Sequence, residues 1–202
     1  MKKKKKIVIR LLISAAGILA VVIALLGFRF RGSVVIRADQ TERTPHDVTA
    51  YRQDDERWAG DVLGESSFTM KSSGCLVSCI ASAISMERRD EVTPGELNRI
   101  FTEHSVYDGE GNIQWAAVDG IGGYSTHVFQ GVSQQEIDQC LAAGHYPIVR
   151  VRVNGVGNFH YVLIVGTENK DYVCMDPLKS ELTELSQYLG RVYAVRMVQS
   201  DR

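Results

Sequence analysis

The sequence lacks the patterns that mark several broad classes of protein. Its formal net charge is only -1, from 23 Lys and Arg against 24 Asp and Glu, so no basic excess indicates a nucleic-acid partner. The only run of lysines, Lys2 to Lys6, stands at the extreme N-terminus. Beyond it we find no heptads, no internal repeat and no low-complexity tract. We therefore expect no nucleic-acid partner.

Cysteine is also scarce, with four in 202 residues. A structural zinc site needs four ligands, usually from paired motifs, and no second Cys or His pair of short spacing accompanies Cys75 and Cys79. We therefore expect no metal and no cofactor. A disulfide framework is an alternative outside a membrane, but the spacing matches no known framework. Cys140 on a helical stripe and Cys174 within a strand are typical of small buried apolar residues.

One long apolar run stands near the N-terminus. From Leu11 to Phe28 the sequence carries no charge over 18 residues, which meets the usual threshold for a membrane-spanning helix. The apolar core of a secretory signal peptide is shorter, roughly 7–15 residues, and is followed by a small-residue cleavage site that we do not find here. We predict an uncleaved anchor at residues 7–28, with a cleaved signal peptide as the alternative.

Basic residues on the two sides of this run predict its orientation. Lys2 to Lys6 with Arg10 outnumber Arg29, Arg31 and Arg37. By the positive-inside rule, the tail at residues 1–6 is cytoplasmic and everything after the anchor is outside the cytoplasm.

After the anchor we expect a linker and one domain. Residues 29–48 are polar and charged, typical of a juxtamembrane linker, with one short strand at Val34–Ile36. Residues 49–202 are long enough to form one domain with its own core. Helices are expected at Cys75–Met86, at Pro94–Glu103 behind the cap Thr93, at Ile113–Val118, and from the capping box at Ser133 and Glu136 to Gly144.

Strands follow these helices. The predicted strands are Ile148–Val153, Phe159–Val165, Tyr172–Met175 and Val192–Val198, with a turn at Gly166–Lys170 and a helical stretch at Leu182–Leu189. Short connections between strands imply antiparallel neighbours. Helices followed by an antiparallel sheet define an α+β domain.

The stretch SGCLVSC, residues 73–79, is the strongest candidate for chemistry. Cys75 stands where the first helix begins, and a helix N-terminus favours the thiolate form of a cysteine. Gly74 is expected to let the chain turn tightly into the helix. Cys79 lies one turn deeper, where the dipole effect has faded, so Cys75 is the candidate nucleophile.

A cysteine nucleophile needs a base and a group that orients the base. His160 stands at the start of the most apolar strand, after a glycine-bearing loop, and a core histidine is an equally good interpretation of it taken alone. Asp176 ends the next strand, where an Asp-Pro turn is the alternative. A hairpin centred on residue 168 would place the two side by side.

The order Cys75, His160, Asp176 resembles papain-like cysteine peptidases, and more narrowly the bacteriocin-processing type and its stand-alone relatives, the peptidase C-thirty-nine-like group. The sequence YRQDDERW at 51–58 is similar to that group's Y-x-Q-x-D-x-R-W, and SGC at 73–75 to its S-G-C-G-P-T-S. Residues 144–151, NFHYV at 158–162 and Asp176-Pro177 are similar to its later blocks. The likeness spans residues 51–178.

The resemblance implies a papain-like α+β fold and four roles. Cys75 would attack a carbonyl carbon, His160 would transfer protons, and Asp176 would orient His160. Gln53 would donate a hydrogen bond in the oxyanion hole, a role that rests on the resemblance alone; a turn residue in a charged loop is the alternative. Leu76, where relatives often have glycine, is expected to narrow the cleft.

Together these features predict a membrane-anchored thiol hydrolase outside the cytoplasm. Its expected partner is a peptide or protein substrate. A cell-wall peptide is a rival substrate, although the D-C-S motif common in such hydrolases is absent. A surface-binding module that has the fold without turnover is the alternative from another class. Leader-peptide processing is not expected, because the bacteriocin-processing members are cytoplasmic domains of transporters.

Overall fold

The computed structural model describes residues 2–39, 41–88 and 91–200. The chain divides into two compact units, one ending at Ser33 and one beginning at Val34. The first unit contains the helix α1, Lys2–Phe30, so the expected basic tail is helical from Lys2 onward, and Met1 lies outside the described residues. Its segment Leu11–Phe30 has a mean hydropathy of 2.7, and none of its residues is buried. By length and composition this segment can cross a membrane, a test that an N-terminal signal sequence also passes.

The second unit is an α+β domain built on an antiparallel sheet. The six-stranded sheet has the order β2-β8-β3-β4-β5-β6, and a separate pair joins β1 to β7. The strands are β1 (Val34–Val35), β2 (Tyr124–Val128), β3 (Ile148–Arg152), β4 (Phe159–Glu168), β5 (Asp171–Met175), β6 (Thr183–Glu184), β7 (Arg191–Val192) and β8 (Ala194–Ser200).

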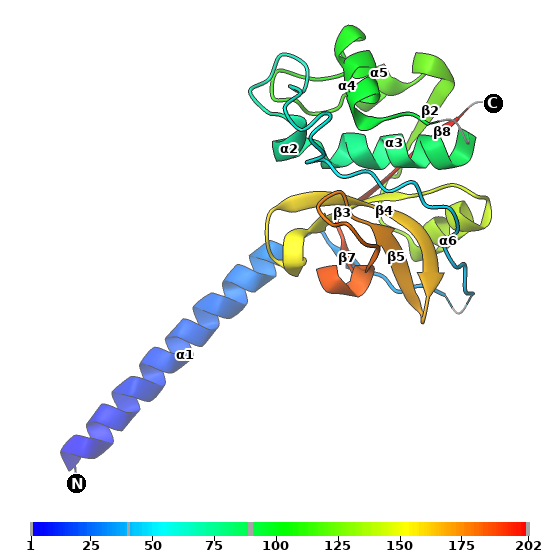
Figure 1. Ribbon diagram of the computed structural model, residues 1–202. Coiled ribbons are helices and arrows are strands. Elements are labelled where there is room, and N and C mark those ends of the chain that lie inside the picture. Colours follow the sequence, from blue (N-terminus) through cyan, green and yellow to red (C-terminus); the bar gives the residue numbers. More distant parts are fainter. Residues whose placement is uncertain (1, 40, 89–90, 201–202) are drawn as a thin grey trace. The chain divides into compact units, whose positions relative to one another are not determined.

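The helices precede most of the strands in the chain. In Figure 1, α3 lies between the sheet and the pair α4 and α5. The helices are α2 (Met70–Ser73), α3 (Cys75–Arg88), α4 (Pro94–Glu103), α5 (Trp115–Val118) and α6 (Gln134–Ala142), with the 3-10 turns η1 (Ile121–Gly123), η2 (Val153–Gly155) and η3 (Leu185–Tyr188).

Local signals account for where these helices begin. Thr93 caps α4 by accepting a hydrogen bond from the Glu96 N–H, and Ser133 caps α6 in the same way through Glu136. The helix α3 is apolar nearly all round, and its residues from Val77 to Ser85 are all buried. A helix of this kind belongs inside a domain rather than on its surface.

The sheet separates two hydrophobic clusters. Side chains alternate between the faces of a strand, so Ile148 and Leu163 pack on the α3 side, while Val149 and Val162 pack on the other. The second cluster includes Ile137 of α6 and Tyr188 of η3. One sheet with a core on each face therefore holds the domain together.

Four details differ from the sequence-based expectations. The strand β4 runs through the turn predicted at Gly166–Lys170 as far as Glu168, with an irregularity between Ile164 and Gly166. The helical stretch predicted at Leu182–Leu189 is the short strand β6 followed by η3. The strand predicted at Val192–Val198 is split into β7 and β8, because the chain leaves one sheet for the other. The strand β2 was not predicted, because its residues stand in a glycine-rich region.

Residues 34–48 belong to the second unit instead of forming a free linker. Ile36 is only 3% exposed, and its N–H donates to the Gly190 carbonyl. Arg43 forms a β-bridge with Thr167, whose hydroxyl donates to the Thr41 carbonyl. This arrangement differs from the linker expected at residues 29–48 and moves the domain boundary to Ser33.

Candidate active site

Cys75 is the first residue of α3, as expected from the sequence, and its side chain is half-buried. It lines a cavity of about 300 Å³ with Leu76, Trp115 and Tyr161. The short helix α2 immediately precedes Gly74, so α3 begins only one residue after another helical turn. The thiol therefore faces a space large enough for a small side chain, beside a helix N-terminus.

Gly74 does not provide the tight turn into the helix that was expected from the sequence. Its φ of -79° and ψ of 7° are open to any residue, so no special turn requires glycine here. A Cβ at this position would instead lie 2.5 Å from the Met70 carbonyl oxygen and 2.8 Å from the Met70 Cα. Glycine is needed because the backbone of α2 approaches this closely.

The other cysteines have different surroundings. All four cysteines are free thiols. The Sγ of Cys79 is fully buried and lies 3.6 Å from the Tyr161 carbonyl oxygen, to which it donates. Burial raises the pKa of Cys79 and of Cys174 well above the ordinary value, and burial also raises that of the half-buried Cys140. A thiol with a raised pKa is a poor nucleophile at neutral pH.

The structure brings His160 and Asp176 into direct contact. The Nε2 atom of His160 lies 2.6 Å from Oδ1 of Asp176, and both residues are buried, at 4% and 3% exposure. The predicted register is off by two residues: Leu163 faces Met175, so Asp176 would face Val162. A register shift of two residues leaves each side chain on the same face of the sheet. Diagonal neighbours on one face remain within reach of long side chains.

Asp176 is held by two further hydrogen bonds. The Leu178 N–H donates to Oδ1 over 2.9 Å, and the Tyr188 hydroxyl donates to Oδ2. Burial would raise the pKa of Asp176, but His160 and these donors hold it below the ordinary value. Tyr188 has no counterpart among the predicted site residues, because nothing in the sequence distinguishes it from a core tyrosine.

The Cys75 side chain also interacts with His160 and contributes to the raised pKa of the ring. Because Nε2 is bonded to Asp176, Nδ1 is the ring nitrogen left for another partner. Burial alone would lower the pKa of His160, but the hydrogen bonds and charges of Asp176 and Cys75 raise it to about 9. The ring therefore stands between a buried carboxylate and a half-exposed sulfur, and it carries a proton at neutral pH.

Gln53 lies beside the same group of residues. It is 4% exposed, its backbone N–H donates to the Pro177 carbonyl, and its Nε2 donates to the Lys71 carbonyl of α2 over 2.7 Å. The Lys71 bond sets the orientation of the amide and uses one of its two N–H groups. Gln53 thus connects the turn after Asp176 with the helical turn before Cys75.

Within the described part of the chain, no group of three or more His, Cys, Asp or Glu residues could hold a metal ion. No model of a known protein family matches the chain, and no curated protein matches it. The geometry around Cys75, His160, Asp176 and Gln53 is therefore the basis on which a function can be assigned.

Proposed function

We propose that this chain is a membrane-anchored cysteine peptidase of papain-like fold that cleaves an amide bond of a peptide outside the cytoplasm. One observation carries the proposal: the buried His160 ring is hydrogen-bonded to Asp176 and also interacts with Cys75, and both partners raise its pKa. A nucleophile, a base and an orienting carboxylate in this order are the parts that acyl transfer by a thiol requires.

The proposed reaction starts from the ion pair in which the Cys75 thiol proton resides on His160. The sulfur attacks the carbonyl carbon of the scissile amide. As the C–N bond breaks, His160 gives its Nδ1 proton to the leaving amine, and an acyl thioester remains on Cys75. Water then attacks the thioester and gives its proton to His160, which restores the thiolate–imidazolium pair.

Asp176 keeps the imidazole in place during both steps. It binds Nε2, so the other nitrogen is directed toward the sulfur, and its negative charge stabilises the imidazolium. Tyr188 and the Leu178 N–H hold the carboxylate in turn. Asp176 and Tyr188 therefore act as positioning residues in this reaction.

Two donors are available for the oxyanion of the tetrahedral intermediate. The Cys75 backbone N–H lies in the first turn of α3, where an α-helix has N–H groups to spare. The second N–H of the Gln53 amide is the other donor, since Lys71 uses only the first. Removal of one such donor slows an acyl-transfer enzyme by about 10²–10³-fold.

The test is labelling of the full-length protein in nonionic detergent with a neutral fluorescent iodoacetamide. A Cys140→Ser background is used because Cys140 is partly exposed. Labelling is expected to be lost in Cys75→Ala and slowed at least tenfold in His160→Ala. It is expected to persist in Cys79→Ala, whose thiol is buried.

A peptide-library digest with the same variants tests turnover. Cleavage by the parent protein and none by Cys75→Ala would support a peptidase. Rapid Cys75 labelling without cleavage of any peptide or cell-wall fragment would instead support a binding module. Equal labelling of all variants would overturn the assignment of Cys75 as the nucleophile.

The proposed orientation has its own test. A membrane-impermeant maleimide added to intact cells is expected to label Cys75, since the domain would face outward. Labelling only after the cells are lysed would place the domain in the cytoplasm.

A further inference from the structure

Three arginines, which we call the arginine ladder, lie on the α3-facing side of the sheet. Arg150 and Arg152 belong to β3, and Arg196 belongs to β8. Arg150 faces Tyr161 in the ladder with β4, and Arg152 faces Phe159. Residues opposite each other project from the same face, so these arginines and aromatic rings form one continuous surface.

The ladder has no counter-charge among the described residues. Within residues 2–39, 41–88 and 91–200, no Asp or Glu lies within ion-pair distance of Arg150, Arg152 or Arg196. The Nε atom of each is buried without a hydrogen-bond partner. The Nη1 atoms of Arg152 and Arg196 each donate to a backbone carbonyl, but no described carboxylate balances their charges. A partly desolvated positive charge without a counter-charge is costly, and a bound anion would offset that cost.

Aromatic rings hold the guanidinium groups in place. The Arg152 guanidinium lies 3.9 Å from the ring centre of Phe159, and that of Arg150 lies 4.4 Å from the same ring. The Arg152 Nη1 also donates to the Gly157 carbonyl over 2.9 Å. Planar guanidinium groups fixed by stacking are well suited to recognising carboxylates.

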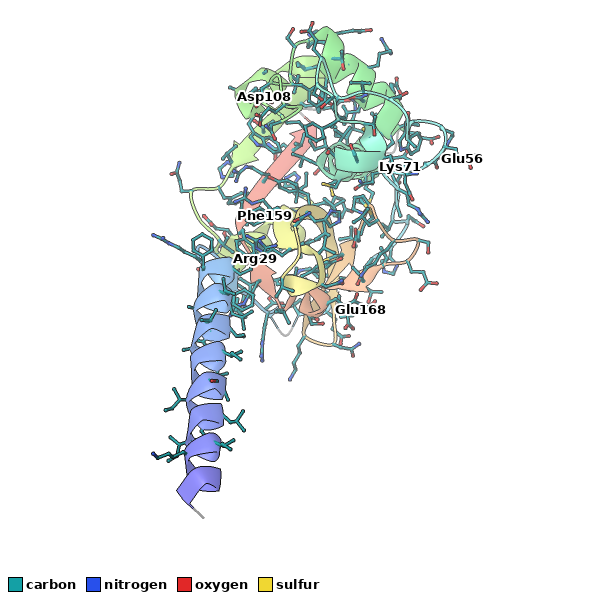
Figure 2. The ribbon with its side chains drawn as sticks, turned by 90° about the vertical axis from the view of Figure 1, so that its left-hand side faces the viewer. Arg29, Glu56, Lys71, Asp108, Phe159 and Glu168 are labelled. Atoms are coloured by element: carbon teal, nitrogen blue, oxygen red, sulfur yellow. The ribbon has the colours of Figure 1, made fainter. Side chains whose placement is uncertain are left out.

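The ladder adjoins the cavity of Cys75. Tyr161 and Trp115 line that cavity. Arg150 lies opposite Tyr161 in the ladder of β3 and β4, and the Arg196 guanidinium lies 5.8 Å from the centre of the Trp115 ring. Figure 2 shows Phe159 below the part of the domain that carries Lys71 and Asp108. A peptide in the cavity would therefore pass close to the ladder.

The cavity itself carries one acidic side chain. Glu110 lines it from the loop before α5, whereas the arginines contact residues that line it. Glu110 would repel an acidic group of a bound peptide, while the ladder would attract one. The two charges would thus favour one orientation of an acidic peptide.

We propose that the arginine ladder is a carboxylate-binding subsite and that the substrates of this site are acidic peptides. The proposal rests on the proposed function, in which the Cys75 cavity binds a peptide. Two sources supply the carboxylate: an internal Glu or Asp side chain, which makes the protein an endopeptidase for acidic sequences, or the C-terminal carboxylate of a short peptide.

The experiment measures binding first, so that it does not depend on turnover. Full-length Cys75→Ala protein in nonionic detergent is titrated with fluorescein-labelled octapeptides of Ala, Gly and Ser, in which a single Glu is moved through each position. Matched peptides contain Gln at the same position, and each peptide is made with a free or an amidated C-terminus. Fluorescence anisotropy gives Kd.

At one or two positions, Glu is expected to bind about tenfold more tightly than Gln, corresponding to one charge-assisted contact. The ratio of the Kd for the Gln peptide to the Kd for the Glu peptide is expected to fall to about one in the double variant Arg150→Gln, Arg196→Gln. In the single variant Arg150→Lys, part of this preference is expected to remain. Arg99→Gln is the matched control, because Arg99 is exposed on α4 and paired with Glu103. A preference that depends on the free C-terminus, not on Glu, would identify the terminal carboxylate as the ligand.

The outcomes separate this proposal from the function on which it rests. A Glu preference without any cleavage by the parent protein would support the subsite and contradict the peptidase. The subsite would be overturned, and the peptidase left intact, if the parent protein cleaved Glu and Gln peptides equally fast at every position. In that case the two kinds of peptide would also bind equally, and amidation of the C-terminus would have no effect. A preference that survives both arginine substitutions would also overturn it. Melting followed through Trp58 and Trp115 verifies that each variant is folded.

Discussion

At the scale of single residues, the position of the Cys75 thiol depends on the lack of a side chain next to it. Gly74 is buried, and the Met70 backbone occupies the space that a Cβ would need. The carbonyl oxygen of Met70 also accepts the Gly74 N–H. Any larger residue must therefore separate α2 from α3, at the point where Cys75, the proposed nucleophile, and the contact of Gln53 with Lys71 lie.

We therefore expect Gly74→Ala to destabilise the domain by about 1–3 kcal/mol, the usual cost of forcing an atom into a packed site. Cys75 labelling is expected to slow at the same time. Urea unfolding of the full-length chain measures the first effect, because both tryptophans, Trp58 and Trp115, belong to the second unit. Gly60→Ala is the control, since a Cβ there meets nothing within 4 Å. Equal unfolding of the two variants would contradict the packing argument.

The protonation of His160 predicts a pH dependence of stability. Its pKa in the folded protein is raised from 6.5 to about 9, so the folded state binds this proton more tightly than the unfolded state does. The resulting stability is fully present below pH 6.5 and is lost as the pH rises through about 9. The loss is on the order of 3 kcal/mol.

Urea unfolding at pH 6 and at pH 9.5 measures this change, with His160→Gln as the reference for all other titrating groups. The variant is expected to show a smaller difference between the two pH values than the parent. A parent that becomes relatively more stable at the higher pH would contradict the assigned proton.

At the scale of elements, the hairpin of β4 and β5 brings together His160, the proposed base, and Asp176, the group proposed to orient it. The register places Asp176 diagonally across from His160, and η3 supplies Tyr188 from behind. The segment at residues 41–45 packs against the same hairpin, where Arg43 bridges to Thr167. That contact is possible because Gly166 has no side chain; a Cβ there would meet the Arg43 carbonyl and the Pro45 ring.

We expect Gly166→Ala to displace this segment and to lower the free energy of unfolding by about 1–3 kcal/mol. Hydrogen exchange is expected to show faster exchange of the Arg43 and Thr167 amides, which now donate to each other's carbonyls. Gly131→Ala is the matched control, because a Cβ at Gly131 meets nothing within 4 Å. Unchanged exchange at both amides would contradict the proposed contact.

At the scale of the whole molecule, the second compact unit begins at Val34, and the apolar helix belongs to the first. A chain that begins at residue 34 keeps the pairing of β1 with β7, and a chain that begins at residue 49 loses it together with the buried Ile36. Burial of one isoleucine side chain is worth about 1.5–3 kcal/mol.

The chain of residues 34–202 is therefore expected to unfold at higher urea concentration than residues 49–202. Circular dichroism and tryptophan fluorescence of both chains provide the measurement, and coincident transitions would verify two-state behaviour. Equal midpoints would mean that residues 34–48 are only a linker.

Local chemistry determined much of this protein without the tertiary structure. The charge-free run predicts an apolar helix outside the domain. Thr93 and Ser133 predict where α4 and α6 begin. The apolar pattern after Gly74 predicts α3, with Cys75 in its first turn. These features depend on residues a few positions apart, so periodicity and capping are sufficient to find them.

Contacts between distant residues were decided only by the tertiary structure. The register of β4 against β5, the position of β8 between β2 and β3, and the packing of Ile36 depend on which surfaces meet. The same holds for Tyr188 behind Asp176 and for the arginine ladder beside the cavity. Sequence periodicity specifies the face of a strand but not its partner, because many pairings bury the same apolar side chains.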